Sequence, residues 1–247
     1  MYPLAIALSL LIGVSLGLLG GGGSILTTPI LIYALDVEPK AAIATSLLVV
    51  GITSAAALVS HARAGNVEWR TGLIFGLAGM AGAAGGGWVA GFISADLLLL
   101  LFAGMMLATA VAMFRGRKQP PTEAEGKAIQ VPKVVAEGLV VGVVTGLVGA
   151  GGGFLVVPAL TLLGGVPMRK AIGTSLLVIA LKSAAGFAGH ASHVSIDWPL
   201  AGTISAAAVL GSFVGARLTS MIPPEALRKG FAVFVVVMAL FVLWQQL

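Results

Sequence analysis

Two glycine-rich segments hold the residues best suited to bind an anion. Each lies between two apolar runs, and a proline follows one to two helical turns later. Such clusters break a helix, and the helix that restarts points its free N–H groups and positive dipole end into the break. We expect an anion cradle there, although the same glycines would also suit close helix packing. The residues are Gly20, Gly21, Gly22, Gly23 and Ser24 in the first segment, and Gly149, Gly151, Gly152 and Gly153 in the second.

Hydroxyl side chains and one lysine could complete this site. Thr45, Ser46, Thr174 and Ser175 could donate hydrogen bonds to an oxyanion, or could bond carbonyls of their own helices. Lys182 lies on the helical face of Ser175, seven residues later, and about 18 Å from Lys170 along a helix. A lysine this deep in a membrane is costly without a partner. An anionic substrate would supply that partner, whereas snorkelling would carry the ammonium group outward.

The composition indicates a membrane protein. Of the 247 residues, 58% are hydrophobic and 9% are charged, whereas soluble domains have about 25% charged residues. The net charge of +5 is more typical of basic cytoplasmic loops than of nucleic-acid binding, because no basic stripe with interleaved aromatics is present. We read the apolar run after Met1 as a first membrane segment, since it lacks the basic region of a signal peptide.

Cysteine and metal chemistry are not expected. The chain has no cysteine and three histidines, which excludes disulfides and thiolate catalysis. His190 and His193 lack the carboxylates that a metal site would need, apart from Asp197. His61 and His190 are expected at the membrane interface, with a role in proton coupling left open. No cofactor is predicted.

The second half of the chain repeats the first. At an offset of 129 residues, the interval between Pro29 and Pro158, similar residues recur without a gap. The matched positions include Thr45 and Thr174, Ser46 and Ser175, His61 and His190, and Trp69 and Trp198. Duplication over this length is a stronger signal than any single motif. It predicts membrane repeats at 1–114 and 134–247, joined by a polar linker at 115–133.

The basic residues predict how the repeats are oriented. Residues 3–19 and 24–35 are each too short to cross a hydrocarbon core of about 30 Å comfortably. If each broken unit goes in and comes back, every repeat crosses an odd number of times and the halves are inverted. The positive-inside rule then puts the linker, Arg63, Arg70, Arg169, Lys170, Arg228 and Lys229 in the cytoplasm and leaves only Lys40 outside. We therefore predict an all-α polytopic membrane protein with two inverted repeats, each a glycine-broken helical hairpin plus three transmembrane helices.

These paired motifs resemble the sulfite exporter TauE/SafE family. Each glycine cluster and proline is followed by Ala-Thr-Ser-Leu at 44–47 or Gly-Thr-Ser-Leu at 173–176. The resemblance covers nearly the whole chain and implies a multi-pass transporter of the cytoplasmic membrane. Its implied substrates are small anions such as sulfite, organosulfonates or related oxyanions.

The sequence thus favours a secondary anion transporter that works by alternating access between two halves. Its expected partners are the anion and the lipid bilayer. An anion channel remains an alternative. An intramembrane hydrolase is much less favoured, because Ser46 and His61, like Ser175 and His190, lie about 22 Å apart along one helix. We therefore expect no enzyme activity.

Overall fold

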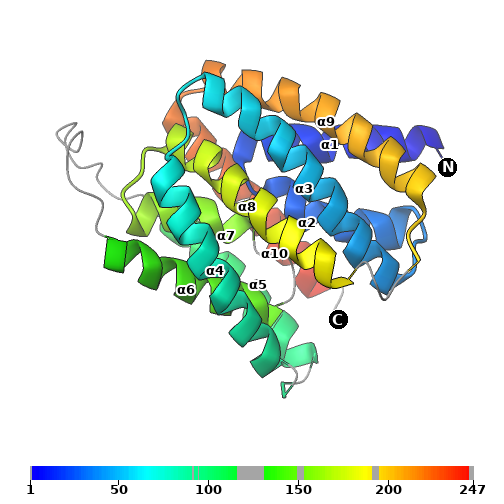
Figure 1. The fold of residues 1–247 in the computed structure, drawn as a ribbon, viewed down its shortest axis with the longest axis horizontal. Helices are drawn as coiled ribbons and strands as arrows, with labels where there is room; N and C mark the ends of the chain where they lie inside the picture. The colour runs from blue at the N-terminus through cyan, green and yellow to red at the C-terminus, as the bar shows by residue number, and fades with distance from the viewer. Residues whose placement is uncertain are drawn as a thin grey trace.

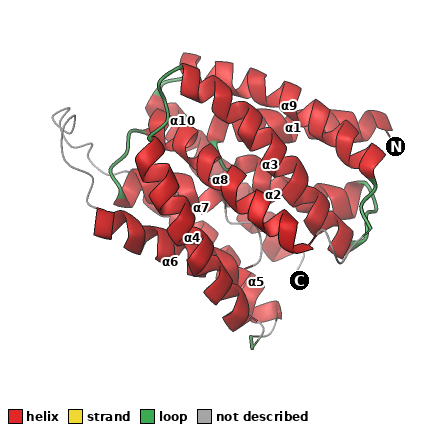
Figure 2. Cartoon of the chain, viewed as in Figure 1, coloured by secondary structure: helices red, strands yellow, loops and turns green. Residues whose placement is uncertain are grey.

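The computed structural model describes residues 2–90, 92–93, 95–115, 131–148, 153–190 and 195–244. Within these ranges the chain folds into helices and short connections, and no strand occurs (Figure 2). The predicted all-α class is confirmed. The helices are α1 (Tyr2–Leu19), α2 (Gly22–Pro29), the π-helical η1 (Ile30–Ala34), α3 (Pro39–Arg63), α4 (Trp69–Ala90), α5 (Ala95–Arg115), α6 (Val131–Val148), α7 (Gly153–Pro158), the π-helical η3 (Ala159–Leu163), α8 (Met168–His190), α9 (Trp198–Met221) and α10 (Pro224–Trp244).

Three helices in the described part of the chain are long and apolar enough to cross a membrane. They are Lys40–Arg63, Met168–Ala188 and Trp198–Met221. Large apolar side chains such as Leu77, Trp88 and Leu210 are exposed on the outer surface, where lipid tails would surround them. Six complete spans remain a prediction. At the ends of the predicted linker, Arg115 belongs to α5 and Lys133 to α6, and residues 116–130 lie outside the described ranges.

A glycine and a proline shape the first broken unit. Gly20 takes a φ of +74° between α1 and α2, a conformation that only glycine adopts at little cost. After Pro29 the helix continues as the π-helical η1, and the amide of Leu35 donates to the carbonyl of Ile30 at 3.1 Å. Gly164 donates to Ala159 at 3.0 Å in the second half. A helix over 24–35 was expected, but not its change of pitch, which follows the proline in both halves.

The first broken unit leads in and returns to its starting side. Ala5, near the beginning of α1, lies in the same buried cluster as Leu31 and Leu35 at the end of η1. The chain therefore turns back at Gly20. From Pro39, α3 runs in the direction opposite to α2 and η1. Its His61 reaches the carbonyl of Gly17, near the turn at Gly20.

Corresponding helices of the two halves exchange partners. α1 of the first half packs along α9 of the second, and α6 of the second packs along α4 of the first (Figure 1). α3 packs on its counterpart α8, and α5 on its counterpart α10. A β-carbon at Gly82 would meet the carbonyl of Leu139, and one at the matched Gly211 would meet the matched Leu10. Small residues thus let the helix backbones approach closely.

Polar contacts gather several connections at one end of the molecule, which we call the linker end. Lys170 at the start of α8 pairs with Glu68 between α3 and α4. Arg169 donates to the carbonyls of Ser220, in the last turn of α9, and of Ile222, just after α9. Lys133 at the start of α6 donates to Leu163, just before α8. Residues 35–38 and 195–197 lie at the opposite end, which we call the cavity end.

Candidate functional site

The two glycine breaks meet inside the protein. A β-carbon at Gly21 would lie 2.7 Å from the carbonyl oxygen of Gly153 and 2.7 Å from the Cα of Phe154. A β-carbon at Gly153 would lie 2.7 Å from the hydroxyl of Ser24. That hydroxyl is buried and donates to the carbonyl of Gly21 at 2.7 Å. The beginnings of α2 and α7 therefore touch through backbone, as the symmetry of the sequence suggests.

Protein atoms surround the other described glycines of the first break. A β-carbon at Gly22 would contact the ring of Phe234 at 3.2 Å, and one at Gly23 would lie 2.6 Å from the carbonyl of Ile12. Close packing of protein atoms therefore accounts for a glycine at both positions in this structure. Gly149, Gly151 and Gly152 lie outside the described residues. The anion cradle remains a prediction.

The end of α1 is held by side chains from distant elements. Nε2 of His61 lies 3.0 Å from the carbonyl oxygen of Gly17, and the hydroxyl of Thr219 lies 3.2 Å from the carbonyls of Gly17 and Leu18. These contacts satisfy carbonyls that the helix end leaves free. The side chain of His61 is buried at 2% exposure, and its expected position at the membrane interface stays a prediction. Thr219 was not foreseen, since nothing local in its sequence points to the break.

The hydroxyls of the second half are engaged within the protein. Ser175 is fully buried, and its hydroxyl lies 2.7 Å from the carbonyl of Ile172 and 3.1 Å from that of Gly20. The hydroxyl of Thr174 accepts the amide N–H of Glu68 at 2.9 Å. Both residues therefore hold the first half against α8. In the first half, Thr45 and Ser46 are buried on α3, and Thr45 lines the cavity described below.

Lys182 is partly buried and bonds to a hydroxyl of a neighbouring helix. Its Nζ donates to Oγ1 of Thr145 on α6 at 2.9 Å, and Thr145 is buried and donates to Gly142 at 3.0 Å. Among the described residues no carboxylate forms an ion pair with Lys182. Thr145 was not foreseen as a partner, because only the packing of α6 brings it to α8.

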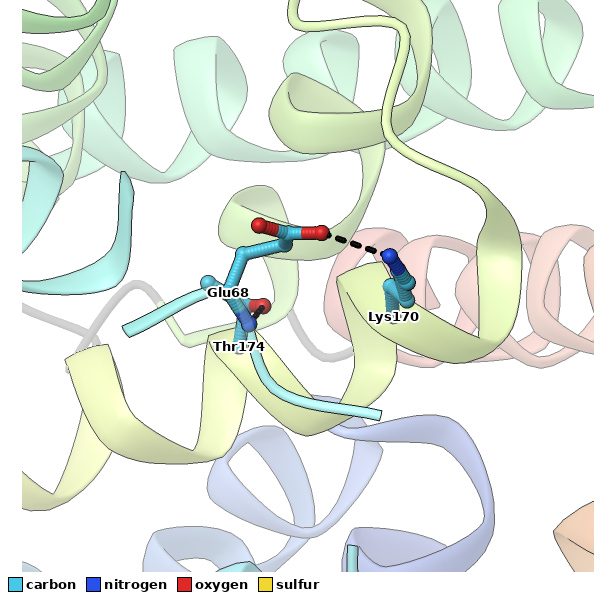
Figure 3. Close-up of polar contacts among 3 residues, drawn as sticks. All are labelled: Glu68, Lys170 and Thr174. Carbon is cyan, nitrogen blue, oxygen red and sulfur yellow. Dashed lines mark hydrogen bonds and ion pairs between the residues drawn. The ribbon is translucent and has the colours of Figure 1, made fainter. Parts of the chain in front are cut away.

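An ion pair closes the linker end. Nζ of Lys170 lies 2.8 Å from Oε1 of Glu68, and both side chains are a little over one third exposed. Figure 3 shows Glu68 reaching over α8 toward Lys170, with Thr174 directly beneath its backbone. No local sequence signal points to this contact, because its two partners lie 102 positions apart.

A cavity of about 340 Å³ opens at the other end. Two carboxyl-bearing residues, Asp36 and Asp197, and two hydroxyl-bearing residues, Thr45 and Ser195, line it together with Ala5, Leu35, Val37, Ala41 and Leu200. Asp197 also caps α9, since its Oδ1 accepts the amide of Leu200 at 3.0 Å. In the described part of the chain, no three His, Cys, Asp or Glu side chains cluster as metal ligands would.

Apolar helices that pack through small residues, with polar contacts gathered at the ends, define an α-helical membrane protein. Residues 5–242 match the family model described as "Sulfite exporter TauE/SafE". The chain belongs to this family, and the resemblance inferred from its glycine and Thr-Ser-Leu motifs is confirmed.

Named relatives agree with this assignment. A "Probable membrane transporter protein" of Xylella fastidiosa strain 9a5c is 36% identical over 241 residues, covering 96% of this chain and 92% of the relative. A protein described in the same words from Bacillus subtilis is 28% identical, covering 92% and 94%. One from Methanocaldococcus jannaschii is 28% identical, covering 98% and 96%. No solved structure matches the chain. Family and relatives together indicate a membrane transporter.

Proposed function

We propose that this chain is a secondary transporter that moves a small anion across the cytoplasmic membrane by alternating access. The anion is sulfite, an organosulfonate or a related oxyanion. The description of the matching family supports this substrate class. The chain would cross the membrane several times, with the two repeats at 1–114 and 134–247 moving relative to each other.

Lys182 is the observation that carries the proposal. Its ammonium group is partly buried between α8 and α6, where it donates a hydrogen bond to the neutral hydroxyl of Thr145. A cation without an anionic partner is expensive at membrane depth, and a bound oxyanion would compensate it. The hydroxyl of Thr145 donates its one proton to the carbonyl of Gly142, so Lys182 is the donor that this pair offers to an anion that binds beside it.

The arrangement of charges supports an inverted pair of repeats. Contacts of Lys133, Arg169 and Lys170 gather at the linker end, whereas Lys40 follows Glu38 at the cavity end. The positive-inside rule would then put the linker end in the cytoplasm. A first broken unit that returns to its own side, followed by α3, α4 and α5, gives each half an odd number of crossings and therefore an inverted partner.

The other predicted substrate-binding residues belong to the same proposal. The glycines and Ser24 at the breaks would offer backbone amides, and Thr45, Ser46, Thr174 and Ser175 would offer hydroxyls. In this structure the hydroxyl of Thr174 accepts the amide of Glu68, and the hydroxyl of Ser175 donates to the carbonyl of Gly20. They would therefore reach a substrate only after the two halves have moved.

Reconstitution into liposomes tests the proposal. Purified protein should accelerate uptake of radiolabelled sulfite or an organosulfonate over protein-free liposomes, and Lys182→Ala should lose most of this uptake. Lys182→Arg is the matched control, because it keeps the positive charge. Counterflow of labelled substrate against a preloaded unlabelled anion separates a carrier from a channel, since a channel gives no transient accumulation. The absence of uptake for every oxyanion offered would contradict the proposed function.

A further inference from the structure

The linker end and the cavity end are built from matched residues. At the offset of 129, Thr174 corresponds to Thr45, Glu68 to Asp197, and Lys170 to Ala41. At the linker end Thr174, Glu68 and Lys170 meet (Figure 3). Glu68 forms an ion pair with Lys170, and its backbone amide donates a hydrogen bond to the hydroxyl of Thr174. At the cavity end the three corresponding residues line an open space of about 340 Å³. The same set of positions is therefore closed in one copy and open in the other.

Two sequence differences account for the closed copy. Lys170 supplies the ammonium group that reaches Glu68, whereas Ala41 has no side chain that could reach Asp197. A β-carbon at Gly173 would collide with the carbonyl of Asn66, so glycine lets the 64–68 connection lie directly on α8. The residue that corresponds to Gly173 is Ala44, whose β-carbon would oppose the same approach.

The hydrogen bond beneath the ion pair is also confined to one copy. The amide of Glu68 donates to Thr174, but no bond among the described residues joins the amide of Asp197 to the hydroxyl of Thr45. Asp197 instead caps α9. In the described part of the chain, these two polar contacts hold the connection on α8 at the linker end, and neither has a counterpart at the cavity end.

We propose that the ion pair between Glu68 and Lys170 is a latch that holds the linker end closed while the cavity end is open. This inference rests on the proposed alternating access, and it names residues that set which end is open. Exposed ion pairs contribute little to stability. With both partners more than one third exposed, the latch can therefore open and close thermally rather than lock the protein.

Thiol labelling can test the latch directly, because the chain has no cysteine of its own. Ala171→Cys puts a reporter on the buried residue next to Lys170, and Ala41→Cys puts one on the wall of the cavity. Each reporter is combined with Glu68→Gln, which removes the charge and keeps the backbone amide on Thr174. The rate of maleimide labelling is measured on purified protein in detergent.

Glu68→Gln should speed labelling at Ala171→Cys and slow it at Ala41→Cys, because one end closes as the other opens. The change should be roughly two- to fivefold, the size expected when an exposed ion pair is lost. The exchange Glu68→Lys with Lys170→Glu is the matched control. It restores the ion pair with its charges reversed and should return both rates toward those of the parent.

Opposite changes at the two reporters support the latch. A rise at both reporters would mean that the ion pair only tightens the fold, and unchanged rates would mean that it controls neither end. Either result would overturn the inference. Labelling needs no substrate, so these outcomes are independent of the liposome assay, and a failure to transport anions would leave the labelling result standing.

Discussion

Nζ of Lys182 donates to Oγ1 of Thr145 at 2.9 Å and joins a cation of the second half's α8 to a hydroxyl of α6. At the offset of 129 these positions correspond to Thr53 and Leu16, so the pair exists in one half only. The helix scaffold is duplicated, whereas this charged centre is not.

Lys182→Ala should lower the rate of anion uptake at least about tenfold, because the loss of a charge-assisted hydrogen bond costs roughly 1.5–3 kcal/mol. Uptake into proteoliposomes measures the rate, and gel filtration checks that the variant remains folded. Lys182→Arg should keep a substantial part of the activity. Uptake at the parent rate in Lys182→Ala would remove this residue from the site.

Thr145→Val should weaken anion binding without removing charge. Valine matches threonine in shape but offers no hydrogen bond, so the ammonium of Lys182 loses the hydroxyl that positions it for the anion. Affinity should fall roughly five- to tenfold at about 1 kcal/mol per lost hydrogen bond. Binding isotherms from thermal shift would measure it, and an unchanged affinity would restrict Thr145 to a structural role.

Addition of a transported anion should raise the unfolding temperature in detergent. A ligand at 100 times its dissociation constant stabilises the native state by about 2.7 kcal/mol. A screen of sulfite, sulfate, thiosulfate, sulfonates and carboxylates would identify the substrate class. The stabilising anion should lose its effect in Lys182→Ala; an equal shift in that variant would place binding elsewhere.

Gly21→Ala should destabilise the protein more than Gly22→Ala. The added methyl group at Gly21 meets backbone of the opposite break at 2.7 Å, and that at Gly22 meets the movable ring of Phe234 at 3.2 Å. Overpacking against backbone costs about 1–3 kcal/mol, whereas a side chain can shift. Thermal unfolding of the two variants side by side would measure the difference, and equal stability would contradict the direct contact between the breaks.

Thr174→Val should cost more stability than Thr45→Val, although the two positions are matched. The first substitution removes the acceptor of the Glu68 amide, at a cost of about 1 kcal/mol or more, whereas no amide of the described residues donates to the hydroxyl of Thr45. Thermal unfolding again measures the effect. A larger loss for Thr45→Val would mean that the cavity end, rather than the linker end, is held by its threonine.

The local features of this fold could be predicted from sequence, because they depend on neighbouring residues. Glycine clusters break helices wherever they occur, and Pro39 starts α3 with Glu38 accepting the amide of Ala41 at 3.2 Å. The duplication predicted that corresponding elements would recur. The change to a π-helix after Pro29 was missed, since it depends on how the helix recovers its hydrogen bonds after a residue without an N–H.

The sequence by itself determined the helical class, the two breaks, the repeat and the family. The tertiary structure alone decided which distant residues meet: Glu68 with Lys170, Lys182 with Thr145, and His61 with Gly17. These contacts join residues 102, 37 and 44 positions apart, and each depends on how helices pack rather than on local spacing. The repeat predicts equivalent halves, but Lys170 in place of Ala41 and Gly173 in place of Ala44 let the 64–68 connection pack directly on α8, because charge and close backbone approach are available at these two positions.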